Sequence, residues 1–129
     1  MKILVFGNPL VEKDSLALRV AKKLEKEFPQ IEFKEFDPVE SLEKEGKNLI
    51  ILDVGEGISK VEVIDDLEKL ENKKILSMHD FDLSYELKLL KELGLIEKVK
   101  IITIPFNLDE DEAFEEVREI ISSLFSKSD

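Results

Sequence analysis

The chain has 129 residues and a formal net charge of −11, from 19 lysine and arginine side chains against 30 aspartate and glutamate side chains. This length is typical of one domain with its own core, so we expect residues 1–129 to form a single domain. The absence of cysteine excludes disulfides, thiolate metal sites and a cysteine nucleophile. The acidic balance argues against nucleic acid and anionic membranes as partners, because both attract clustered lysine and arginine.

No apolar run approaches the roughly 20 residues that a helix needs to span a bilayer. The apolar segment Met1–Phe6 is also too short for a signal peptide. We therefore expect a cytoplasmic protein.

The first half of the chain alternates between strands and helices. Lys2–Phe6 is a continuous apolar run that predicts a buried strand, followed by a turn at Gly7-Asn8-Pro9. A helix is expected next, and Pro29 ends it. Its buried face recurs at every fourth position, at Leu16, Val20, Leu24 and Phe28. Ile31–Phe36 predicts a second strand.

The middle of the chain is expected to hold two further strands. A short, weakly helical stretch runs from Asp37 to Gly46, and Leu49–Leu52 then predicts a third strand with Asp53 at its C-terminal end. Gly55-Glu56-Gly57 predicts a flexible loop. Val61–Ile64 follows as a short strand, and the pattern of Lys73–Ser77 fits either a strand or an irregular segment.

The last third predicts helix, strand and helix. The first helix has its apolar positions at Leu83, Leu87 and Leu90, with Leu89 and Leu93 adjacent, and Gly94 ends it. Val99–Ile104 predicts the last strand, and the final helix is marked by Phe114, Val117, Ile121 and Leu124. These leucine-rich helices show no apolar seam that can be separated from the core, so we expect a monomer.

Alternating strands and helices with continuously apolar strands predict an α/β fold, a three-layer α/β/α sandwich with a mostly parallel sheet of about five strands. In such folds ligands bind at the C-terminal ends of the strands, near the point where the strand order reverses. Three candidate ligand residues follow predicted strands or precede predicted helices there, namely Asp14, Asp53 and His79.

Each candidate also has a purely structural interpretation. Asp14 precedes the helical periodicity and fits a helix N-cap. His79 is the single histidine of the chain and fits a surface or hydrogen-bonded structural residue. Asp53 is harder to explain without function, because a carboxylate at the edge of a central strand needs a cation, a proton or hydrogen-bond donors to compensate its burial.

Two carboxylates and one imidazole suit a borderline transition metal such as nickel or zinc better than calcium or magnesium.

Sequence motifs for other kinds of binding and catalysis are absent. The sequence has no G-x-G-x-x-G dinucleotide fingerprint, no phosphate-binding P-loop and no G-x-S-x-G nucleophile elbow.

From Met1 to about Ile121 the chain resembles the nickel–iron hydrogenase maturation endopeptidases. The resemblance rests on Ile3–Leu10 followed by the acidic Asp14, on a strand ending in Leu52-Asp53, and on Ser77-Met78-His79 before a leucine-rich helix. It implies an endopeptidase that removes the C-terminal extension of a hydrogenase large-subunit precursor. It also implies that Asp14, Asp53 and His79 contact nickel carried by that precursor, so no permanent cofactor is expected.

The resemblance leaves the catalytic base unassigned, and Asp53 is the best candidate for it. Where the family has a second acidic residue and a glycine, this chain has Lys13 and Ala17. These departures favour an alternative, a non-catalytic binding domain of the same fold. A receiver-like phosphoacceptor domain, with Asp53 as the acceptor, is a further alternative, although Gly7-Asn8-Pro9 stands where receivers carry an acidic pair.

Overall fold

The computed structural model describes residues 1–7, 12–36, 41–66, 74–75 and 83–125. Its helical elements are α1 (Glu12–Glu27), the short 3₁₀ helix η1 (Leu42–Glu45), α3 (Leu83–Glu92) and α4 (Glu110–Phe125). Its strands are β1 (Lys2–Val5), β2 (Glu32–Glu35), β3 (Asn48–Glu56), β4 (Glu62–Ile64), β5 (Lys74–Ile75) and β6 (Lys98–Pro105). None of the helices within these ranges is long and apolar enough to cross a membrane.

The described strands form one mixed sheet in the order β2-β1-β3-β6-β4. The four strands β2, β1, β3 and β6 run parallel, as the alternation of apolar strands and helices in the sequence predicted. Strand β4 pairs antiparallel with β6, and the two-residue β5 pairs antiparallel with the end of β3. The mostly parallel sheet of a three-layer α/β sandwich is therefore confirmed. Lys74–Ile75, the part of the ambiguous segment that the structure describes, is a strand.

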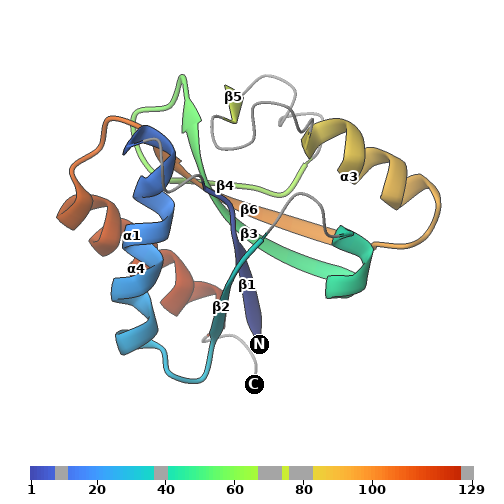
Figure 1. Ribbon diagram of the computed structural model, residues 1–129, viewed down its shortest axis with the longest axis horizontal. Helices are drawn as coiled ribbons and strands as arrows, with labels where there is room; N and C mark the ends of the chain where they lie inside the picture. The colour runs from blue at the N-terminus through green and yellow to red at the C-terminus, as the bar shows by residue number, and fades with distance from the viewer. Residues whose placement is uncertain (8–11, 37–40, 67–73, 76–82, 126–129) are drawn as a thin grey trace.

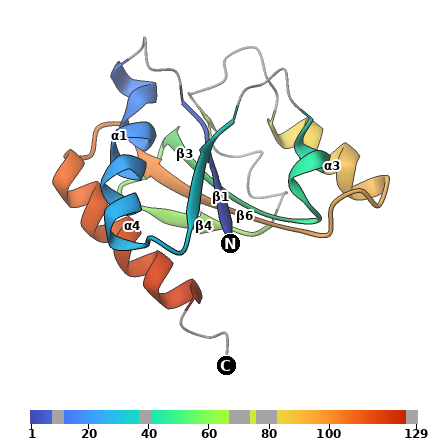
Figure 2. The same cartoon turned by 60° about the horizontal axis from the view of Figure 1, so that its bottom comes forward.

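Helices cover both faces of the sheet, and each face has its own core (Figure 1). Helices α1 and α4 lie side by side on one face, whereas α3 and η1 lie on the other, as the turned view also shows (Figure 2). Successive residues of β3 divide between these cores because strand side chains alternate. Leu52 and Val54 join the core under α1 and α4, whereas Leu49 and Ile51 join the core under α3.

The helix boundaries follow from local chemistry. Helix α1 buries the predicted face and ends at Glu27, since Pro29 disfavours helical backbone before it. Helix α4 begins after Asp109, whose Oδ2 accepts hydrogen bonds from the backbone N–H groups of Asp111 (3.1 Å) and Glu112 (3.2 Å). Gly94, with φ +75°, follows α3 in a conformation that favours glycine.

The structure corrects the predicted end of β3. The strand continues to Glu56, so Asp53 lies inside it and Gly55-Glu56 is paired rather than a flexible loop. Gly55 is the register partner of Pro105 on β6 and also of Ile75 on β5. Neighbours on both sides therefore extend the strand past its apolar run. The backbone leaves the sheet at Gly57, whose φ is +79°.

The leucines of the α3 region divide between the core and the surface. Leu87 and Leu90 are buried, as predicted, but Leu89 and Leu93 are 37% and 62% exposed. Tyr85, four residues before Leu89, is also exposed. Tyr85 and Leu89 on α3 and Leu93 directly after it therefore form an exposed apolar seam at a spacing of four residues, which the sequence pattern did not separate from the core.

Candidate functional site

The carboxyl ends of β1, β3 and β6 lie at one edge of the sheet, because these strands are parallel. Helix α1 follows β1 and helix α4 follows β6, so both begin at this edge. The strand order also changes direction here, since β2 lies on one side of β1 and β3 on the other. This is the topological switch point at which α/β folds of this kind bind ligands.

Asp53 lies on β3 beside this switch point, and its side chain is fully buried. Strand alternation turns it toward the face that α3 covers, like Leu49 and Ile51. Its Oδ1 accepts a 2.7 Å hydrogen bond from the backbone N–H of Val54. A buried carboxylate on a central strand is costly unless donors or a cation compensate it. Asp53 is therefore the described residue that best fits a functional role.

Two further polar residues extend from Asp53 across the sheet. Thr103 on β6 is the register partner of Asp53, and Glu62 on β4 is in turn the register partner of Thr103. Directly paired residues place their side chains on the same face. Thr103 is fully buried, and its hydroxyl makes no hydrogen bond within the described part of the chain. We refer to Asp53, Thr103 and Glu62 as the polar row.

Aromatic rings border the polar row on the side of β1. Phe6 follows β1 directly, and its backbone N–H donates a 2.9 Å hydrogen bond to the carbonyl of Leu52. The rings of Phe6 and Phe36 are stacked, with centroids 5.0 Å apart and planes 12° from parallel. Both rings belong to the core under α3, so the polar row continues an otherwise apolar face.

The other two predicted ligands are only partly placed. Asp14 is the third residue of α1, whereas an N-cap precedes the first helical residue, so N-capping does not account for it. Its side chain lies outside the described residues, and so does the whole of His79. Among the side chains that the structure does describe, no three acidic or imidazole groups gather as a metal site would require. The set of Asp14, Asp53 and His79 thus stays a prediction.

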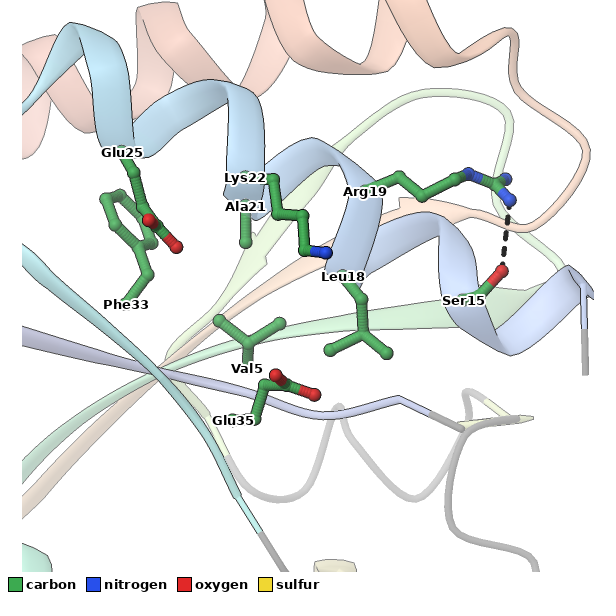
Figure 3. A pocket seen from close by; sticks show the side chains of 9 residues that line it. All are labelled: Val5, Ser15, Leu18, Arg19, Ala21, Lys22, Glu25, Phe33 and Glu35. Carbon is green, nitrogen blue, oxygen red and sulfur yellow. Dashed lines mark hydrogen bonds between the residues drawn. The ribbon is translucent and has the colours of Figure 1, made fainter. Parts of the chain in front are cut away.

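A separate pocket of about 560 Å³ opens on the opposite face, between α1 and β2 (Figure 3). Helix α1 contributes Leu18 and Lys22, and the strands contribute Phe33 and Glu35. Arg19 lines it too, with Nη1 donating a 3.0 Å hydrogen bond to the Ser15 hydroxyl.

No sequence pattern indicates this pocket, although the charged residues beside the apolar face of α1 are visible in the sequence. Val5 and Phe33 in the pocket wall belong to the core under α1, whereas Asp53 faces α3. The sheet thus separates the pocket from the polar row.

The sequence matches no protein-family model, and no curated protein matches it significantly. The fold is similar to the crystal structure of a hydrogenase 2 maturation peptidase from Thaumarchaeota archaeon SCGC_AB-539-E09, with a TM-score of 0.56 and 16% sequence identity. That match covers 95% of this chain and 96% of the other. An uncharacterized protein from Wolinella succinogenes gives a TM-score of 0.55 and 17% identity, covering 95% and 97% of the two chains. The predicted resemblance is thus confirmed at the level of the whole fold.

Proposed function

We propose that this protein is an endopeptidase that removes the C-terminal extension of a nickel–iron hydrogenase large-subunit precursor. The observation that supports this proposal most directly is the likeness of the fold, over 95% of the chain, to a hydrogenase 2 maturation peptidase. The position of Asp53 adds independent support, because a fully buried carboxylate lies beside the switch point of the sheet.

In this proposal the nickel belongs to the precursor and is part of the substrate. Asp14, Asp53 and His79 complete its coordination and so recognise a precursor that is ready for cleavage. Two carboxylates and an imidazole are donors that suit nickel. The fully buried Asp53 fits this role, because a bound cation compensates the cost of a buried carboxylate.

Binding the substrate's nickel holds the scissile peptide beside Asp53. A metal ion in such a position either polarises the peptide carbonyl or activates a water molecule. Asp53 is the best candidate for the general base, since it is the fully buried carboxylate nearest the switch point among the described residues. With Asp53 in this role, we assign the enzyme to the aspartyl-type endopeptidases.

In this proposal the enzyme acts in the cytoplasm, as a monomer. Its complex with the precursor is transient, because a processing enzyme must release its product.

The experiment that tests the proposed function measures the mass of a precursor. Purified protein is mixed with a large-subunit precursor from the same organism, with and without nickel, and we expect a C-terminal peptide to be lost only from the nickel-loaded sample. Asp53→Asn and His79→Ala variants should leave the loaded precursor intact. Normal processing by either variant contradicts the site assignment. If wild-type protein leaves several loaded precursors uncut, the non-catalytic binding domain becomes the better interpretation.

A further inference from the structure

Thr103 carries a buried hydroxyl that makes no hydrogen bond within the described part of the chain. Its side chain is fully buried, and Oγ1 has no hydrogen-bond partner in the described ranges. Burying a hydroxyl without a partner costs stability, since its hydrogen bonds to water are lost and not replaced. Ile101, two residues earlier on β6 and therefore on the same face of the sheet, is fully buried and aliphatic. A valine of the same shape would therefore suit the fold better.

The position of Thr103 suggests what the hydroxyl serves. It is the register partner of Asp53, on the same face of the sheet and equally buried. Neighbouring strands of a sheet lie roughly 4.8 Å apart, which places a threonine hydroxyl within reach of an aspartate carboxylate at the paired position after small side-chain rotations. Hydrogen bonds at catalytic sites are often long or poorly aligned before the substrate binds and tighten in the complex.

We infer that Thr103 is the positioning residue of Asp53, and that its hydroxyl donates a hydrogen bond to the Asp53 carboxylate when the precursor is bound. This inference rests on the proposed function and adds a residue to its site. The bond fixes the orientation in which the carboxylate meets the substrate. Without this bond the Asp53 carboxylate is still present to contact the substrate's nickel but is less well oriented, so Thr103 affects the rate of cleavage more than the binding of the precursor.

Glu62 is a competing acceptor, because it pairs with Thr103 from the other side. It is only partly buried, whereas Asp53 is completely buried. Water can supply hydrogen bonds to a carboxylate that reaches the surface, but a fully buried one depends on donors from the protein. We therefore assign the hydroxyl to Asp53.

The test compares wild type with Thr103→Val, which removes the hydroxyl at constant shape, and Thr103→Ser, which retains it. With nickel-loaded precursor we expect kcat to fall roughly tenfold in Thr103→Val, the effect of one lost hydrogen bond to a charged group. KM should change less than threefold, and Thr103→Ser should keep kcat within about threefold of wild type.

Denaturant unfolding of the same proteins without precursor supplies a second readout. We expect Thr103→Val to be at least as stable as wild type and Thr103→Ser to be less stable, so that the order of stability opposes the order of activity. A hydroxyl with a purely structural role would lower both quantities in Thr103→Val, and that result overturns the inference. Thr103→Val with unchanged kcat overturns it as well.

Glu62→Gln distinguishes the two acceptors. We expect Thr103→Val to lower kcat by the same factor in the Glu62→Gln background as in the wild type. If the effect on kcat disappears in that background, the hydroxyl belongs to Glu62 and the inference is overturned. Failure of the proposed function has a different signature, because wild-type protein would then leave every loaded precursor uncut. Failure of the inference alone leaves the wild type active.

Discussion

Lys34 on β2 donates a 2.7 Å hydrogen bond from Nζ to Oε2 of Glu45 in η1. Lys2 on β1 pairs with the other carboxylate oxygen, so one glutamate holds η1 against two neighbouring strands. The Glu45 side chain is only 4% exposed. Hydrogen bonds from Lys2 and Lys34 hold the pKa of the Glu45 carboxyl below its ordinary value, against the opposing effect of burial.

This arrangement predicts that the protein becomes less stable at acid pH. Because the folded-state pKa of Glu45 is lowered, its contribution is complete above the ordinary glutamate pKa of about 4.3 and is lost as the pH falls through the folded value. Glu45→Gln should lower the free energy of unfolding by roughly 1–2 kcal/mol at pH 7. The difference from wild type should shrink below pH 4 in denaturant titrations. A difference that stays constant from pH 7 to pH 3 would contradict this prediction.

Replacing Asp53 should separate activity from folding. Asparagine retains an oxygen acceptor for the Val54 N–H but removes the charge, so we expect Asp53→Asn to fold with an unfolding midpoint no lower than wild type. Processing of nickel-loaded precursor should fall at least about 100-fold. The matched control is Asp65→Asn, an exposed carboxylate just after β4, which should process normally. Equal rates of precursor processing by the two variants would show that Asp53 is not part of the site.

The cap of α4 offers a local test of stability. Asp109 accepts from two backbone N–H groups of the first helical turn, so Asp109→Ala should cost about 1 kcal/mol. Asp109→Asn retains an acceptor and should cost only a few tenths of that amount. Thermal unfolding of the three proteins measures the difference. Asparagine and alanine variants of equal stability would show that the side-chain acceptor at position 109 does not stabilise the helix.

Two leucines of the α3 region should respond very differently to truncation. Leu90 is 4% exposed and packs in the core under α3, so Leu90→Ala should cost about 2–5 kcal/mol. Leu93, three residues later, is 62% exposed, and Leu93→Ala should stay within about 0.5 kcal/mol of wild type. Denaturant unfolding of both variants provides the comparison, and similar losses would mean that the exposed seam is covered in solution.

Sequence patterns predicted the elements well where the determinants are local. Leu16, Val20 and Leu24, spaced four residues apart, define the buried face of α1, and Pro29 lies just beyond the end of this helix. The same reasoning identified Asp53 as the carboxylate hardest to explain by structure alone, because it directly follows the apolar run Leu49–Leu52 of a central strand. The end of β3 was predicted wrongly, since Gly55-Glu56 has the composition of a loop and is held in the strand by β5 and β6.

The sequence alone therefore determined the order of the elements and the buried face of α1, because apolar periodicity and helix-ending residues act within a few positions of one another. The tertiary structure decided which residues surround Asp53. Thr103 lies 50 positions away in the chain, and nothing local to either residue indicates their pairing. Strand register is set by the packing of whole strands against the helices, so the neighbours of a buried side chain emerge only when the sheet is assembled.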